Sequence, residues 1–476
     1  MTGARLAHLA TSALLASFVA ACVTPGPEGP TATPLSAAAA GLQGSATSPT
    51  IDDRWWRSFG DQRLDDLVAR TLEDSPSLQA AAARVARAEA VMARADAQRL
   101  PQADARLDAA HQRFTANGLY PPKFAGKVED AGNLQASLAW ELDFFGRNRS
   151  AFEAALGAAK AAHADQQGAR LILAAGVVRL YVQLAQLVGQ REVASRTLAQ
   201  RTQVLGLIRQ RVRAGLDSQV ELSLGEEALP DARLALEGLD EQITLRRHAL
   251  SALSVQPPNA LETLSPSIAN LRSTPLPAEV PADLLGRRAD VDAARLRIEA
   301  ATADLHAARA DFYPSVNLLA FAGFNAIGLD KLLDIGSRQS GIGAAVRLPL
   351  FDAGRLRATY RGKAADVDAA VAAYNAAVVE AIHEAADQIS SLQSIARQSL
   401  EQRQAQASAE QAYQLAVARY GSGLGSYLLV LSAETGVLGQ RRAGVDLQAR
   451  VLVAQADLMR ALGGGYVSTT WADLAQ

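Results

Sequence analysis

Residues 134–142 read Leu-Gln-Ala-Ser-Leu-Ala-Trp-Glu-Leu, and apolar and polar side chains alternate through this stretch. Neighbouring residues of a β-strand point to opposite faces of the sheet, so the alternation predicts a strand over about residues 133–143. The two faces differ in character, with Leu134, Ala136, Leu138, Trp140 and Leu142 opposite Gln135, Ser137, Glu141 and Asp143. Such a strand separates an apolar environment from a polar one.

Three other stretches show the same alternation, at about residues 101–115, 315–324 and 340–350. In the last of them Ile342, Ala344, Val346, Leu348 and Leu350 lie opposite Gly343, Ala345 and Arg347. Strands of roughly nine to eleven residues can cross a bilayer when they are tilted. The alternative is a pair of hairpins packed on a soluble sheet, but the rest of the chain offers little strand pattern to complete one.

The number of strands restricts how they could enter a membrane. Membrane barrels begin at about eight strands, and an open sheet edge in lipid would leave backbone groups without hydrogen bonds. The sequence therefore leaves two options: the hairpins stay out of lipid, or several chains share one barrel. Three chains would supply twelve strands.

The chain also contains a tandem repeat. Leu142-Asp143-Phe144-Phe145-Gly146-Arg147 resembles Leu350-Phe351-Asp352-Ala353-Gly354-Arg355, and the two glycines are 208 residues apart. Residues 211–218 resemble residues 419–426 at the same offset, and Pro101 precedes Pro314 by 213 residues. We expect one repeat over residues 51–265, a second over 266–466 and a C-terminal tail over 467–476.

Each repeat is expected to contain one very long helix, over about residues 148–212 and 356–418. At 1.5 Å per residue such helices reach about 95 Å. Apolar side chains step by four and three residues, as in Leu173, Val177, Leu180, Leu184 and Leu187, which is the spacing of coiled coils. Glycine-containing tips at about 213–218 and 420–426 would reverse the chain into a shorter returning helix. A coiled-coil scaffold with no transport role would explain the helices but not the strands.

The N-terminus has the pattern of a lipoprotein export signal. Residues 1–21 carry Arg5 and then an apolar run that ends in Val19-Ala20-Ala21-Cys22. Cys22, the single cysteine of the chain, stands where a bacterial lipobox requires the residue that is acylated. A plain signal peptide with an incidental cysteine is the alternative. We expect residues 22–50, rich in Pro, Gly, Ser, Thr and Ala, to form a lipidated tether with little to pack.

Composition argues against several other classes of protein. The formal net charge of −2 gives no basic surface for nucleic acid, and a lone cysteine allows no internal disulfide. No run reaches the roughly 18 apolar residues of a membrane-spanning helix. Glu380 and His383 form one Glu-x-x-His pattern, but no second copy accompanies it as a di-iron site would need. We expect no metal, no cofactor and no enzymatic activity.

Several motifs, in their order along the chain, resemble those of the TolC-like outer membrane factors, specifically the lipidated NodT type that serves resistance-nodulation-division pumps. They are Trp55-Trp56-Arg57-Ser58-Phe59-Gly60-Asp61 with Leu64 and Leu67, Asp290-Val291-Asp292-Ala293-Ala294, residues 308–314, residues 350–355 and residues 461–466. The resemblance covers nearly the whole chain after the signal segment. It implies an α+β membrane protein: a trimeric twelve-stranded barrel, four strands from each chain, continuous with a long periplasmic helical barrel.

The same resemblance implies where partners and the channel mouth would lie. A periplasmic adaptor protein, itself bound to an inner-membrane pump, would dock at the helical tips, on Gly215, Leu216, Ser218, Gly423, Leu424 and Ser426. Carboxylates that often ring the pore beyond the second tip are replaced here by Leu429 and Ser432. Glu221, the counterpart in the first repeat, would form a ring of three carboxylates. A solvated glutamate on a helix face is the competing interpretation.

The predicted function is that of an exit duct in the bacterial outer membrane, lipid-anchored and extending into the periplasm. It would conduct small molecules such as drugs passively, as the last component of a tripartite efflux pump. The alternatives are the same fold in type I protein secretion, or a periplasmic coiled-coil scaffold lipoprotein.

Overall fold

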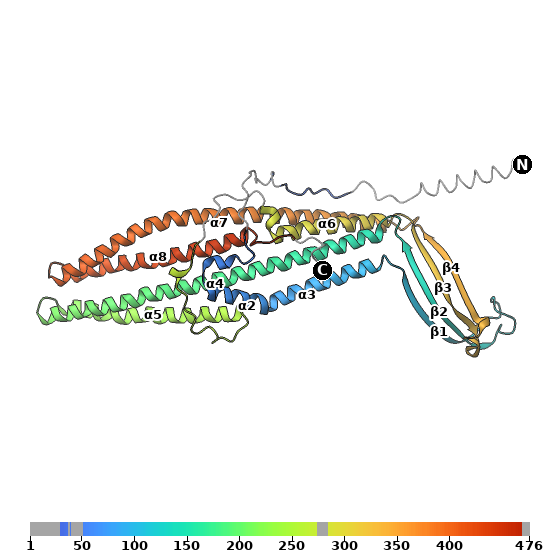
Figure 1. Cartoon of the computed structure of the whole chain (residues 1–476), viewed down its shortest axis with the longest axis horizontal. Coiled ribbons are helices and arrows are strands. Elements are labelled where there is room, and N and C mark those ends of the chain that lie inside the picture. Colours follow the sequence, from blue (N-terminus) through green and yellow to red (C-terminus); the bar gives the residue numbers. More distant parts are fainter. Residues whose placement is uncertain (1–28, 37–38, 40–50, 274–283, 469–476) are drawn as a thin grey trace. The chain divides into compact units, whose positions relative to one another are not determined.

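A computed structural model describes residues 29–36, 39, 51–273 and 284–468, and Figure 1 shows its elements. The chain divides into two compact units. The first comprises residues 1–34, 84–162 and 294–374, and the second comprises residues 35–83, 163–293 and 375–476. The expected signal segment, Cys22 and nearly all of the C-terminal tail lie outside the described residues.

The first unit contains a four-stranded antiparallel sheet with the strand order β1-β2-β3-β4 (Figure 1). Its strands are β1 (Gln102–Arg113), β2 (Val128–Leu142), β3 (Ser315–Ile327) and β4 (Arg338–Arg347). The β2 strand begins five residues earlier than the sequence predicted. The β4 strand stops at Arg347, so the prediction was wrong for Leu348 and Leu350, which lie beyond it. Pro349 has no N–H to donate to a sheet, which explains the early end.

The strand register separates the sheet into the two faces that the alternation indicated. Leu138 lies opposite Ala320, which lies opposite Ile342, so these apolar side chains share one face. Large side chains on that face remain exposed in the chain, and Ile342 is 88% exposed. An exposed apolar face of this kind needs lipid or another chain to cover it.

The opposite face of the sheet carries a polar network. The Gln339 side-chain amide donates to Asn133 at 2.8 Å and to Gln135 at 3.3 Å, and Gln135 donates to Ser137 at 3.1 Å. Phe321 also lies on this face, and its ring covers Gly341, where an added Cβ would approach the ring to 2.7 Å. Leu319 shares this face, so the polar face contains two large apolar side chains that the alternation did not predict.

The repeated motif forms the turn that leads from a strand into a long helix. Asp143 accepts a hydrogen bond from the backbone N–H of Arg149 at 2.8 Å, and Asp352 accepts one from Leu356 at 2.8 Å. The following glycines, Gly146 and Gly354, have φ angles of 76° and 89°, which residues with a Cβ rarely adopt. The repeat therefore conserves a backbone geometry: an aspartate that caps the helix and a glycine that permits the turn.

The two long helices are α4 (Arg147–Arg213) and α7 (Arg355–Gly421), each of 67 residues. The returning helices are α5 (Gln219–Leu253) and α8 (Tyr427–Ala461). Shorter helices are α2 (Gln62–Asp74), α3 (Pro76–Ala97) and α6 (Ala289–Ala310), with short 3-10 segments such as η1 (Trp55–Phe59). The two long helices, each followed by a shorter returning helix, are those that the sequence predicted.

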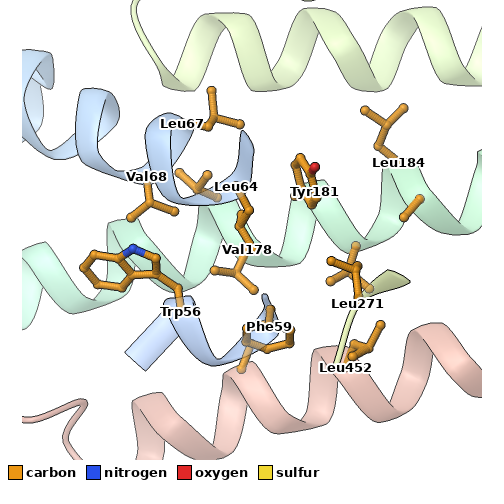
Figure 2. Packing of buried hydrophobic residues seen from close by; sticks show 14 of the residues in the cluster. Trp56, Phe59, Leu64, Leu67, Val68, Val178, Tyr181, Leu184, Leu271 and Leu452 are labelled. Carbon is orange, nitrogen blue, oxygen red and sulfur yellow. The ribbon is translucent and has the colours of Figure 1, made fainter. Parts of the chain in front are cut away.

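The main hydrophobic core of the second unit gathers around the middle of α4. Val178, Tyr181 and Leu184 of α4 pack with Trp56 and Phe59 of η1, and with residues of α2 and α8 (Figure 2). The Tyr181 hydroxyl donates to Asp61 at 2.7 Å. Burial, together with this bond, raises the pKa of Tyr181 above its usual value. The opening aromatic motif of the sequence therefore anchors the chain against the long helix.

Helix α4 also contains an 18-residue window that is apolar enough to cross a membrane by length and composition, although 44% of that window is buried inside the protein. Polar residues interrupt the apolar run, so a count of consecutive apolar residues does not reveal the window. Two of these residues are used in packing, since Arg179 pairs with Asp457 and Gln186 donates to Asp446 at 2.8 Å. The buried residues of the window belong to the main hydrophobic core of the second unit.

The closing glycine motif holds the C-terminal end of α8 in place. Gly463, Gly464 and Gly465 all have positive φ angles, and a Cβ on Gly463 would lie 1.8 Å from the carbonyl oxygen of Arg287. The next residue, Tyr466, donates through its hydroxyl to Asp292 at 2.6 Å. Only glycine fits this close approach of two backbones.

Candidate functional site: the helical tips

Both helical hairpins reverse through the same turn. At the first tip the N–H of Gly215 donates to the carbonyl of Val212 at 3.0 Å, and that of Leu216 donates to Arg211 at 2.9 Å. At the second, Gly423 donates to Tyr420 at 3.1 Å and Leu424 to Arg419 at 2.8 Å. These bonds satisfy the last carbonyls of each helix in a Schellman-type cap, and the two glycines have φ angles of 69° and 75°.

Each tip presents an exposed leucine. Leu216 is 65% exposed and Leu424 is 71% exposed. Ser218 and Ser426 stand at the N-caps of α5 and α8, so the predicted docking residues of each hairpin lie within one short turn. The structure brings these residues together at each tip, while their role in docking stays a prediction.

Glu221, the predicted pore-ring residue, takes part in a capping box at the start of α5. Its carboxylate accepts hydrogen bonds from the N–H of Ser218, at 2.9 Å, and from the Ser218 hydroxyl. The bond from the hydroxyl, followed by those from backbone N–H groups, holds the pKa of Glu221 below its ordinary value. The carboxylate is therefore charged at neutral pH and also stabilises the helix start. Leu429 and Ser432, on α8, are both exposed.

A cluster that the sequence reasoning missed links the two hairpins at the same level. Arg211 of α4 donates to both carboxylate oxygens of Asp217, at 2.9 and 3.1 Å, and to the carbonyl of Tyr420 at 3.0 Å. The Tyr420 hydroxyl also donates to Asp217, and the Arg211 guanidinium lies over the Tyr420 ring, 4.8 Å from its centroid. Asp217 thus joins the first tip to the end of α7.

The charges of this cluster support one another. The bonds from Arg211, followed by the bond from Tyr420, hold the pKa of Asp217 below its usual range. Burial and the adjacent carboxylate raise the pKa of Tyr420, so its hydroxyl keeps its proton and acts as a donor. The sequence contains a sign of this cluster. When the two repeats are aligned, Tyr420 takes the place of Val212, and Asp217 takes the place of Gly425. These two differences supply the donor and the acceptor of the link.

A second polar layer joins the hairpins about three helical turns further from the tips, since Arg201 lies ten residues before Arg211 on α4. The Arg201 guanidinium donates to Glu434 of α8 at 3.2 Å, to Asp231 of α5 at 3.0 Å and to the carbonyl of Ala228 at 2.9 Å. The side chains of Arg201 and Glu434 are only 17% and 8% exposed. Helix α5 continues past Pro230 beside this contact. A buried charge pair of this kind holds three helices in one register.

Another charged group lies in the first unit, where the sheet meets the helices. Arg147 donates to Glu141 at 2.5 Å and lies 3.9 Å from Asp311, beside a cavity of about 290 Å³ that Arg347 also lines. These contacts connect the ends of β2 and α6 to the start of α4.

No group of three or more potential metal ligands occurs among the described residues. Nδ1 of His383 lies 2.9 Å from the carbonyl oxygen of Val379, within its own helix.

Comparison with known proteins identifies the family. The model of the family described as outer membrane efflux protein matches residues 67–254 and again residues 280–464. The chain belongs to the outer membrane efflux protein family. The two matches follow the two repeats, and the predicted family resemblance is confirmed.

Relatives of this family match over most of their length. The multidrug resistance outer membrane protein MdtQ of Escherichia coli O6:H1 is 31% identical over 424 residues, which is 87% of this chain and 88% of the relative. The pyoverdine export outer membrane protein OpmQ of Pseudomonas aeruginosa is 30% identical, covering 95% of this chain and 97% of the relative.

Solved structures agree with the fold. The outer membrane protein VceC of Vibrio cholerae superposes with a TM-score of 0.82 at 34% identity, covering 87% of this chain and 99% of that one. The outer-membrane channel OprN superposes with a TM-score of 0.82 at 27% identity, covering 93% and 99%. The predicted fold class and the outer-membrane location are therefore confirmed for this efflux protein.

Proposed function

We propose that this chain is the exit duct of a tripartite efflux pump, through which small molecules pass unmodified from the periplasm to the exterior. The observation that carries the proposal is the sheet of the first unit. It has one exposed apolar face, one polar face and two outer strands, β1 and β4, whose outer edges can pair with further strands.

Closure of the barrel requires other copies of the chain. Pairing β4 of one copy with β1 of the next satisfies the backbone groups at both edges, which lipid cannot do. Three copies give twelve strands, apolar toward lipid and polar toward the lumen. Exposed aromatic side chains at the helical end of the strands, Phe144, Phe145, Tyr313 and Phe351, mark the periplasmic boundary of the membrane.

The names of the relatives favour small molecules as cargo. One relative is a multidrug resistance protein and another exports pyoverdine, which are both small-molecule roles. This favours efflux over type I secretion of proteins. The polar network on the lumen face offers hydrogen bonds to water and cargo, as a passive duct requires.

The helical tips are the surface for the periplasmic adaptor. Leu216 and Leu424 expose apolar area that a partner can cover, and Gly215, Ser218, Gly423 and Ser426 fix the turns that present them. Energy for transport comes from the inner-membrane pump to which the adaptor binds. Around the threefold axis, Glu221, Leu429 and Ser432 would line or narrow the mouth, with the three Glu221 carboxylates attracting cations.

An acyl group on Cys22 anchors the mature chain to the outer membrane. One acyl chain binds a membrane marginally, whereas two or more anchor it stably. Wild-type cells should incorporate labelled palmitate into the protein, and the Cys22→Ser variant should incorporate none. Label in the variant would refute this part of the proposal.

The duct itself is tested by single-channel recording. Purified protein in detergent should run as a heat-resistant trimer and should insert into planar bilayers with discrete conductance steps. A particle that stays monomeric and never changes bilayer conductance would contradict the proposed function. A drug-efflux assay then compares wild-type cells with cells that lack the gene for this protein. Reduced drug export without the gene would support small-molecule export over protein secretion.

A further inference from the structure

The segment of residues 29–36 does not behave as the loose tether that the sequence indicated. The backbone N–H groups of Thr31 and Ala32 both donate to Oδ1 of Asp368, each at 2.8 Å. The Thr31 hydroxyl donates to the other carboxylate oxygen, Oδ2, at 3.2 Å. One carboxylate of α7 therefore binds three donors from a segment more than 330 residues away in the chain.

The segment also packs against the helices. Ala32 contacts a hydrophobic cluster formed by Leu305 of α6 and by Val367 and Val371 of α7. Further along, the N–H of Leu35 donates to Asn375 of α7 at 2.7 Å. The contacts advance along α7 in the same direction as the segment, from Asp368 to Asn375.

The sequence explains why these backbone groups are available. Pro30 and Pro34 flank the bound residues, and proline favours an extended chain without internal hydrogen bonds. The N–H groups between the two prolines are thus left to bind outside partners. The three bonds, with that of the Ala32 N–H contributing most, hold the pKa of Asp368 below its usual value, so the carboxylate is charged at neutral pH.

We propose that Asp368 is a clip that fixes residues 29–36 along α7 and thereby sets the height of the lipid anchor relative to the barrel. The part about height rests on the proposed acylation of Cys22. The clip itself does not depend on acylation, because all its atoms belong to Thr31, Ala32 and Asp368.

The lengths are consistent with this role. Asp368 lies 13 residues into α7, which begins at Arg355, so it is about 20 Å below the start of the helix. From Cys22 to Thr31 there are nine residue steps, which reach at most roughly 30 Å. A clipped chain can therefore bring its acyl group to the membrane boundary at the start of α7, with little excess.

The clip is tested by hydrogen exchange on the purified full-length protein. The amides of Thr31 and Ala32 should be protected in the wild type, and Asp368→Ala should speed their exchange at least tenfold. The matched control is Asp366→Ala, which removes the same charge two residues away, where Asp366 faces Lys363 at 3.5 Å. The proposed clip would be refuted if the Thr31 and Ala32 amides of the wild type exchanged as fast as those of a free peptide. It would also be refuted if Asp368→Ala and Asp366→Ala sped their exchange equally.

The height of the anchor is tested by shortening the connection. Deleting residues 24–28 leaves four residue steps between Cys22 and Thr31, which reach about 14 Å. This is shorter than the distance of about 20 Å from Asp368 to the start of α7. The acylated deletion variant should therefore lose protection of Thr31 and Ala32. A non-acylated form, with Cys22→Ser behind an ordinary secretory signal, should keep that protection despite the deletion.

The outcomes separate the two proposals. Protection that survives the deletion in the acylated protein would overturn the positioning role while leaving acylation intact. Absence of palmitate from the wild-type protein would overturn acylation, and the positioning role with it, while the exchange comparison of Asp368→Ala and Asp366→Ala would still decide the clip.

Discussion

The Tyr420 hydroxyl of α7 donates a hydrogen bond to the Asp217 carboxylate at the opposite tip, and Arg211 binds the same carboxylate through two further bonds. The two hairpins of one chain are thus joined near their ends by residues that differ between the repeats. If the tips narrow the mouth, loosening this link should widen it.

The first prediction concerns Tyr420→Phe, which removes the hydroxyl but keeps the ring in the cluster around Tyr427 and Val430. We expect a severalfold larger conductance in planar bilayers, because the hairpins separate more easily. One such bond contributes about 1 kcal/mol. The control is Tyr413→Phe, in the same cluster and two turns earlier on α7. Equal conductance of Tyr420→Phe and wild type would refute a role in gating.

The second prediction concerns pH. The pKa of Asp217 lies below its ordinary value of 3.8, so the folded state favours the ionised form. The stabilisation from this group is therefore complete above the unfolded value and is lost as the pH falls through the lower folded value. Conductance should rise only below about pH 4, and Asp217→Asn should remove that step. A step that persists in the variant would assign it to another group.

The third prediction concerns the buried pair of Arg201 and Glu434. Glu434→Ala leaves the Arg201 guanidinium with only part of its partners, and breaking a buried pair is destabilising by about 3–5 kcal/mol. The exposed pair of Glu226 and Arg209, whose side chains are about half exposed, supplies the control. Glu226→Ala should change stability by at most about 1 kcal/mol. Calorimetry in detergent measures both, and similar melting temperatures for the two variants would contradict the argument.

The fourth prediction concerns the lipid face of the sheet. Leu138→Arg places a charge among Ala320 and Ile342 and should destabilise the assembled barrel by about 2–4 kcal/mol near the membrane midplane. Ser137→Arg is the matched control, since Ser137 lies on the polar face of the same strand. Heat resistance of the trimer on gels reports both variants. Greater loss in the Ser137 variant would reverse the assignment of the two faces.

The local pattern of the sequence determined much of this structure. The alternation of residues 134–142, the glycine-containing tips and the repeated Asp143 and Asp352 turns each depend on neighbours in the chain, so they could be predicted from spacing alone. The four strands and the two long helices follow from them. The family was also recognisable, because its motifs occur in order along nearly the whole chain.

Only the tertiary structure decided which distant groups meet. Tyr420 donates to Asp217, Arg201 donates to Glu434, and Thr31 donates to Asp368. The two residues of each pair are about 200 or more positions apart in the sequence. Each contact requires a particular rotation and register of two packed helices, which a heptad pattern does not specify for single polar residues. The docking of residues 29–36 likewise depends on which hydrogen-bond partners lie opposite, and that is a property of the fold.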